Sequence, residues 1–182
     1  MANSISEEEV NIIIKNHKTW MEKNDKGERA VLEKNDLSNF IMNEVNLWRA
    51  DLYKIILSGA HLVKADLSAA DLRGATCVNT NFTFANLTAA DLRFTNLRFA
   101  EFVNASLQYS RLMDSDMEGA IMINANLDGA DLRRVNLTNA DLRNASLRNV
   151  NFGNASFGKT LFTGADITGA IFPLNPIGAI GL

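Results

Sequence analysis

The chain offers few side chains that could serve as nucleophiles, bases or metal ligands. Its two histidines, His17 and His61, lie far apart, and its single cysteine, Cys77, has no histidine or second cysteine at ligand spacing. No Gly-x-Ser-x-Gly sequence and no phosphate-binding glycine loop occurs. The many acidic residues recur at a fixed interval, which indicates a structural role. We therefore predict no catalytic residue, no cofactor and no metal site, and that the protein is not an enzyme.

Charge and composition exclude further classes of protein. The 182 residues include 18 basic and 21 acidic side chains, a net charge of -3, so the basic excess typical of nucleic-acid-binding proteins is missing. No apolar run approaches the roughly 20 residues that cross a bilayer. The N-terminus is acidic where a secretory signal is basic, and one cysteine forms no internal disulfide. We expect a cytoplasmic protein with no direct nucleic-acid or membrane contact.

A repeat of five residues organises most of the chain. Every fifth residue from Leu37 to Phe172 is apolar, which gives 28 consecutive centres without insertion or deletion. A small residue, most often Ala, stands two positions before most of the centres, and Asp or Asn commonly lies between them, as in Ala70-Asp71-Leu72. Because side chains alternate along a short strand, the small residue and the centre face the interior while the Asp or Asn faces outward.

A period of five fits neither a helix nor a continuous strand, but it fits a chain that turns a corner every five residues. Four such pentads would form one coil, so that residues 20 apart stack along the axis. Glycines at the last position of several pentads, such as Gly59 and Gly119, suit a turn with an unusual backbone conformation. The 28 pentads then give about seven coils, and a spacing of about 4.8 Å between strands gives a rod of roughly 34 Å.

The repeated A(D/N)LXX motif, from about Asn35 to Leu174, resembles the pentapeptide-repeat family. The resemblance implies an all-β fold, a right-handed quadrilateral β-helix. The segments His17–Trp20 and Gly27–Ala30 are similar to the leader of bacterial members of that family. We therefore divide the chain into an N-terminal helical cap at 1–34, a β-solenoid at 35–174 and a C-terminal tail at 175–182.

The N-terminal segment is predicted to be a helix that covers the first coil. Ser6 and Glu9 form a capping-box pattern. Apolar residues and His17 then recur at helical spacing on one face, and the run Asn24-Asp25-Lys26-Gly27 is predicted to end the helix. A solenoid needs such a cover, because its apolar core is otherwise exposed at each end.

At the other end, Pro173 and Pro176 lack a backbone N–H, so the ladder of hydrogen bonds is predicted to stop there. The tail is apolar and rich in glycine, and it has no helical pattern. Members of the family that dimerise end to end often do so through their C-terminal coil and a terminal helix, and no helical pattern follows the last coil here. We nevertheless expect a homodimer through this end, although the tail itself is an alternative cover for the last coil.

Comparing outward positions 20 residues apart distinguishes two faces. One alternates acid and base, as in Asp71/Arg73 and Asp91/Arg93, and neutralises itself. Another is unusually apolar, and bulky groups lie at turn positions of the middle coils. Such clusters often mark a protein contact. The candidate contact surface comprises Val63, Phe84, Val103, Ile121, Ile123, Phe94, Phe99 and Tyr109. The alternative is that the aromatic residues only pack along neighbouring coils.

Two functions remain open. The first is a non-enzymatic scaffold that presents flat faces to a protein partner. The second comes from the resemblance, because some pentapeptide-repeat proteins mimic DNA, bind gyrase and confer quinolone resistance. B-DNA carries about one negative charge per 1.7 Å, whereas the coils carry 14 acidic and 12 basic residues from Asp36 onward. The balance of charge favours the scaffold.

Overall fold

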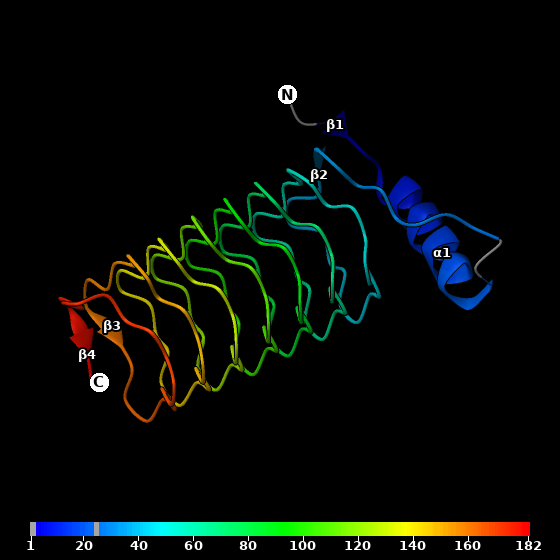
Figure 1. Cartoon of the computed structure of the whole chain (residues 1–182). Helices are drawn as coiled ribbons and strands as arrows, with labels where there is room; N and C mark the ends of the chain where they lie inside the picture. The colour runs from blue at the N-terminus through cyan, green and yellow to red at the C-terminus, as the bar shows by residue number, and fades with distance from the viewer. Residues whose placement is uncertain (1–2, 24–25) are drawn as a thin grey trace.

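The computed structural model describes residues 3–23 and 26–182, which form one helix followed by a long solenoid (Figure 1). The helix lies at one end of the rod and the C-terminus at the other (Figure 1). Short parallel strand pairs join each chain end to a neighbouring coil. The elements are β1 (Asn3–Ser4), α1 (Glu7–Lys23), β2 (Asn35–Asp36), β3 (Thr160–Leu161) and β4 (Ala179–Ile180).

Parallel β-bridges join residues 20 apart along the whole solenoid, from Val31 with Asp51 to Asn151 with Ile171. Four pentads therefore make one coil, as predicted. We name the four sides in chain order, so that face A lies opposite face C and face B opposite face D. In the second, third and fourth coils the centres are Leu52, Leu72 and Leu92 on face A, Leu57, Cys77 and Leu97 on face B, Leu62, Phe82 and Phe102 on face C, and Leu67, Leu87 and Leu107 on face D.

Each pentad places its residues as the alternation requires. Most centres and most residues two positions earlier are buried, and Leu72 and Ala70 are 0% and 1% exposed. In the last coil the centres Ile167 and Phe172 are half-buried. The residue between them faces outward and has a local function. Asp71 Oδ1 accepts a hydrogen bond of 3.1 Å from the backbone N–H of Arg73, and the same bond recurs in most pentads. Asp and Asn recur here because their side chains satisfy a turn N–H that the ladder leaves unpaired.

The last residue of each pentad up to Gly169 has a positive φ, which turns the corner. Gly59 and Gly119 take φ of 68° and 67°, as expected for glycine. Non-glycine residues such as Lys54, Phe94 and Arg134 adopt the same conformation, with φ of 54°, 61° and 59°. The hydrogen bonds between coils hold these residues in a region that costs an L-residue roughly 1–2 kcal/mol, and the sequence gives no sign of this strain.

The solenoid begins one pentad earlier than the boundary at residue 35. Ala30 and Leu32 are 1% and 0% exposed, and the N–H of Leu32 donates to the Asp51 carbonyl at 2.8 Å. Val31 stands where Asp or Asn is usual, so the motif is hidden in the sequence. The first coil therefore includes residues 30–34, and the cap is correspondingly shorter.

Helix α1 covers the first coil, as predicted. The Ser6 N–H and hydroxyl both donate to Glu9 Oε2 at 2.8 Å, and the Glu9 N–H donates to Ser6 Oγ at 3.2 Å, which completes the capping box. Val10 and His17 are buried against the core. The helix ends at Lys23, and the predicted stop at Asn24-Asp25 lies outside the described residues.

His17 fixes the helix to the start of the solenoid. Its side chain is fully buried, and Nδ1 accepts a hydrogen bond of 3.0 Å from the Ala30 N–H. The ring stacks on Trp20, with centroids 5.4 Å apart, and Trp20 packs against Trp48 of the first coil. Burial lowers the pKa of His17, and the nearby Arg29 adds to this effect, although the Trp48 backbone partly opposes it. His17 is therefore a neutral anchor.

Acidification is expected to loosen this cap before it affects the coils. Since the pKa of His17 is lower in the folded protein than its ordinary value of 6.5, the unfolded chain takes up the proton more readily. The stability that His17 contributes is complete above pH 6.5 and is lost as the pH falls below it. Tryptophan fluorescence during urea unfolding at pH 7 and pH 5 measures the loss, because Trp20 and Trp48 are the only tryptophans.

A matched control is His17→Asn, whose Oδ1 stands where Nδ1 does and can accept the Ala30 N–H, but which does not titrate. The variant should show no change in urea midpoint between pH 7 and pH 5. An equal pH dependence in both proteins would show that another group is responsible.

The C-terminal tail does not behave as the sequence predicted, because the hydrogen-bond ladder continues past the prolines. The ladder does not stop at Pro173, because the tail folds back and β4 pairs in parallel with β3. The Phe162 N–H donates to the Ile180 carbonyl at 2.8 Å. The register is 19 residues instead of 20, so the prolines interrupt the repeat without ending the pairing. The tail thus adds one rung to face C.

Four phenylalanines form the core beneath this rung. Their ring centroids are 4.8–6.1 Å apart, in stacked, tilted and edge-to-face arrangements. Most centres of the middle coils are leucines. At the C-terminal end of the rod, the interior is filled by Phe152, Phe157, Phe162 and Phe172.

Candidate protein-contact surface

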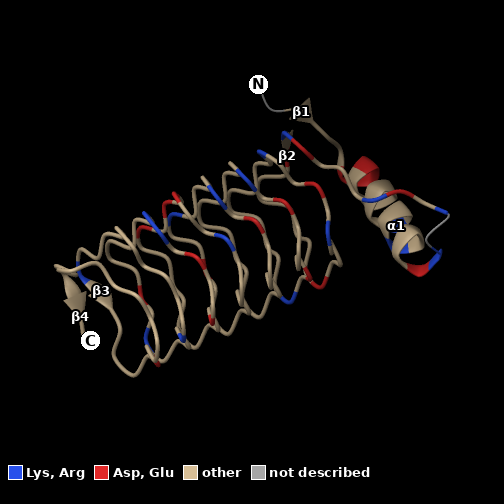
Figure 2. Ribbon diagram, in the orientation of Figure 1, with Lys and Arg blue, Asp and Glu red and all other residues tan. Residues whose placement is uncertain are grey.

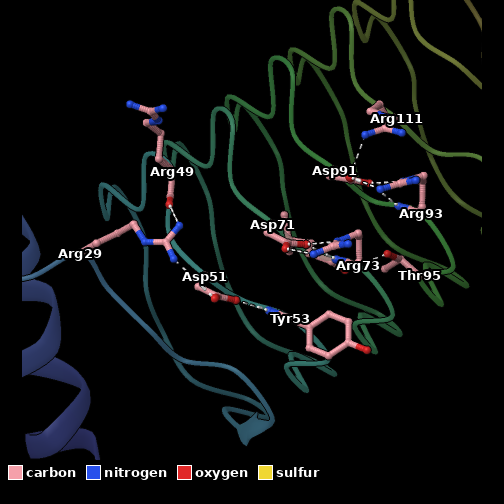
Figure 3. A network of polar contacts seen from close by, with 11 residues as sticks. Arg29, Arg49, Asp51, Tyr53, Asp71, Arg73, Asp91, Arg93, Thr95 and Arg111 are labelled. Carbon is pink, nitrogen blue, oxygen red and sulfur yellow. Dashed lines mark hydrogen bonds and ion pairs between the residues drawn. The ribbon is translucent and has the colours of Figure 1, made fainter.

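Face A carries a ladder of paired charges (Figure 3). Arg73 and Arg93 each bind the carboxylate two residues earlier through two nitrogens, at 2.6–2.8 Å. Arg111 reaches back to Asp91 at 3.2 Å. Hydrogen bonds from Arg73 hold the pKa of Asp71 below its ordinary value. The face is therefore neutral along its length, as the sequence predicted.

Faces B and D also pair their charges, as does the corner between faces A and B. On face B, Arg98 binds Asp116 and Glu118. On face D, Arg148 binds Asp128 at 2.5 Å, and at the corner Arg134 binds Asp114 at 2.6 Å. Blue and red segments alternate along the rod, so no acidic stripe stands out (Figure 2). These pairs leave little unbalanced charge for an electrostatic partner.

Face C carries few charges in the middle coils. Val63, Val103 and Ile123 lie in one column on this face, and Ile121 lies in the column beside Ile123. All four side chains are half-buried. On face C between Val63 and Ile123, the only outward charged residues among the described ones are Lys64 and Glu101. Lys64 pairs with Glu44, and Glu101 has no ion-pair partner in the same part of the chain. These residues form an apolar strip that remains accessible to a partner.

The structure separates the predicted contact surface into two parts. Residues 20 apart share a column, so each of the four aromatic residues of the predicted surface lies at a different corner. Phe84 and Phe99 occupy the two corners that border face C. Phe94 and Tyr109 border face A on the opposite side. A flat partner on face C can contact six of the eight predicted residues but cannot reach Phe94 or Tyr109.

Two corner aromatics also have a packing role. A Cβ added at Gly119 would lie 2.5 Å from Phe99 Cδ1, and one at Gly129 would lie 2.8 Å from Tyr109 Cδ1. Each ring therefore lies over the glycine of the next coil. Phe99 is still 47% exposed and Tyr109 66% exposed. Phe99 and Tyr109 therefore do pack along neighbouring coils, which was the alternative to a protein contact. Part of each ring nevertheless remains accessible.

Ile41 belongs to face C and was missed by the sequence analysis. It is 72% exposed and bridges to His61 in the column that continues to Ile121. Counting back 80 residues from Ile121 would have found it. Its pentad departs from the A(D/N)LXX motif, because Ile41 stands at the position where Asp or Asn is typical.

The single cysteine of the chain is not part of this surface. Cys77 is a face B centre, fully buried, and burial raises the pKa of its thiol to about 12. Across residues 3–23 and 26–182, no group of three or more His, Cys, Asp or Glu residues could hold a metal ion. In the same part of the chain, no helix has both the length and the apolarity to cross a membrane.

Eight overlapping matches to the family model described as pentapeptide repeats cover residues 30–173. The matches begin at the first buried pentad of the structure. The chain belongs to the pentapeptide-repeat family. The fold implied by this family and by its solved members is a right-handed β-helical solenoid, and the coils described above are its repeating units.

Two solved pentapeptide-repeat structures share the fold. HetL from the cyanobacterium Nostoc sp. strain PCC 7120 is 30% identical, with a TM-score of 0.51 over 83% of this chain and 81% of HetL. HetL is involved in heterocyst differentiation regulation. A protein from the Arabidopsis thaliana thylakoid lumen is 26% identical, with a TM-score of 0.53 over 54% of this chain and 68% of that protein. Pentapeptide-repeat proteins are generally structural or binding proteins.

The fluoroquinolone resistance protein QnrB1 is 17% identical, with a TM-score of 0.47 over 82% of this chain and 72% of QnrB1. This likeness is too low to transfer a function. The search of curated proteins found no match.

Proposed function

We propose that this pentapeptide-repeat protein is a non-enzymatic scaffold that binds a protein partner through face C. The observation that carries the proposal is the apolar strip of Val63, Val103, Ile121 and Ile123, bordered by Phe84 and Phe99. The four aliphatic side chains are half-buried, and the two rings beside them are exposed. Clusters of partly accessible apolar groups are typical of protein contacts. The involvement of HetL in regulation gives a fold-level analogy for such a role.

The test replaces two strip residues with lysine. Val103→Lys with Ile123→Lys places two charges at the centre of the proposed contact, where a partner would have to desolvate them. We expect at least a tenfold loss of affinity for a partner captured by the wild-type protein. Titration of the purified partner measures the loss, and circular dichroism checks that the coils remain folded.

Val78→Lys is the matched control. Val78 occupies the same pentad position and is also half-buried, but it lies on face B. Its substitution should leave partner binding unchanged. Equal losses from both variants, or no loss from the face C variant, would contradict the proposal.

We also propose that two copies associate through the C-terminal end. Leu174, Ile177 and Leu182 are 109%, 75% and 51% exposed, although β4 covers part of the last coil. Sedimentation equilibrium should give the mass of two chains, and Leu174→Lys with Ile177→Lys should give one. A wild-type monomer at all concentrations would rule this interface out.

Gyrase binding remains the alternative function, and no observation favours it. The arginines of faces A, B and D are paired with carboxylates, so the surface does not imitate the continuous negative charge of a DNA duplex.

A further inference from the structure

The first coil has an open backbone edge on face C. In the middle coils, each outward residue exchanges hydrogen bonds with the preceding coil; the Glu101 N–H, for example, donates to the Thr80 carbonyl at 3.0 Å, and the Glu101 carbonyl accepts from Phe82 at 2.7 Å. Ile41 holds the equivalent position in the first coil. Among the described residues, its N–H and its carbonyl have no backbone partner. These groups face the N-terminal end of the rod.

The chain itself shows how such an edge can be paired. On the adjacent face B, β1 lies in parallel beside β2, and the Asn3 N–H donates to the Lys34 carbonyl at 2.8 Å. The residues of β1 are exposed and extended. Two residues of extended backbone are therefore sufficient to continue the ladder beyond the first coil. Face C has the same geometry but lacks the added strand.

Beside this edge lies an apolar hollow between α1 and the first coil. It has a volume of about 280 Å³ and is lined mainly by Val10, Ile14, Phe40, Met42 and Val45. A second hollow of about 510 Å³, which includes Met21, shares Ile14 and Val45 with the first. Side chains alternate along a strand, so a strand paired with Ile41 would direct one side chain toward α1. The hollow accommodates an apolar side chain of that strand.

The rim of the hollows carries three carboxylates, two of which are paired with lysines. Glu22 and Glu44 contact Lys18 and Lys64 at 4.0 and 3.5 Å, and both pairs are exposed. Glu7 lines the hollow next to Ile41 and has no ion-pair partner in the part of the chain that the structure describes. A basic residue beside the apolar one would therefore find a carboxylate within reach.

We propose that this edge binds an extended peptide segment of a partner protein as an added β-strand. The backbone of the segment pairs with the N–H and carbonyl of Ile41, an apolar side chain enters the hollow, and a flanking Lys or Arg lies near Glu7. This mode of recognition takes affinity from main-chain hydrogen bonds and specificity from the pocket. The site is separate from the apolar strip on face C and does not depend on it.

The test uses a synthetic peptide with the sequence Lys-Val-Leu-Val-Lys, acetylated and amidated at its ends. Fluorescence anisotropy of a labelled copy measures affinity, and the ¹⁵N amide signals of Ile41 and Asn43 report the location. We expect binding with shifts at these amides. A peptide methylated on its three central nitrogens should bind at least tenfold more weakly, because the methyl groups remove donors and prevent close approach of the strands.

Ile41→Pro removes the open donor without removing a hydrogen bond from the ladder, and it should weaken the unmethylated peptide by a similar factor. Val103→Lys on the strip should not affect binding. Absence of binding at millimolar peptide overturns the proposal, as does equal binding of the methylated peptide or shifts confined to other coils. Dimerisation of the wild-type protein through this edge also overturns it, because a second copy would then be the occupant.

Discussion

Leu107→Asp is expected to abolish the cooperative unfolding of the rod. Leu107 is a face D centre in the middle of the solenoid and is 0% exposed. Removing its side chain costs roughly 2–5 kcal/mol, and burying an unpaired carboxylate adds several kcal/mol more. Since each coil contacts only its neighbours, the lesion also uncouples the two halves. Thermal unfolding followed by circular dichroism should show either an unfolded chain or two separate transitions.

Asn104→Asp is the matched control, because it adds the same charge at an exposed corner three residues away. Its melting curve should match that of the wild type. A single, wild-type-like transition for Leu107→Asp would refute the assignment of centres on which the description of the fold depends.

Phe152→Ala is expected to have the second largest effect. Phe152 is fully buried and contacts the rings of Phe157, Phe162 and Phe172, with centroids 4.8–6.1 Å away. The loss of a buried phenylalanine costs about 3–5 kcal/mol. Because the cluster lies in the last coils, the C-terminal end should unfold first. Hydrogen exchange should show faster exchange at the amides of Phe162 and Ile171, while the first coils remain protected.

Phe94→Ala removes the same atoms from a side chain that is 62% exposed. Its effect on stability should be below about 1 kcal/mol. A loss as large as that of Phe152→Ala would mean that the corner rings stabilise the rod as much as the interior ones do.

The period of five was sufficient to predict the interior of the rod. Side chains alternate within each pentad, and residues 20 apart stack, so the side chains at positions such as Leu72 and Ala70 must point into the interior. The same arithmetic placed Val103 and Ile123 in one column. The capping box of Ser6 and Glu9 was also readable, since it depends on residues only three apart.

Other features depend on contacts that no local pattern records. Ala30 begins the first coil through hydrogen bonds to residues about 20 positions later, and its pentad has Val31 in place of Asp or Asn. The return of β4 to β3 depends on tertiary pairing after two prolines. The predicted contact surface also contained Phe94 and Tyr109, but the 20-residue stacking places both at corners that border face A.

The 20-residue register of the coils divides the surface into four parallel faces, and each face consists of columns with their own composition. Removing or duplicating 20 residues would shorten or lengthen every column and keep each one in line. Removing only five residues would leave every buried pentad intact, yet it would turn everything beyond that point by a quarter. The apolar column of Val103 and Ile123 would then continue into the residues of a different side. Natural variation in length can therefore preserve the core in steps of five residues but preserve a binding surface only in steps of 20.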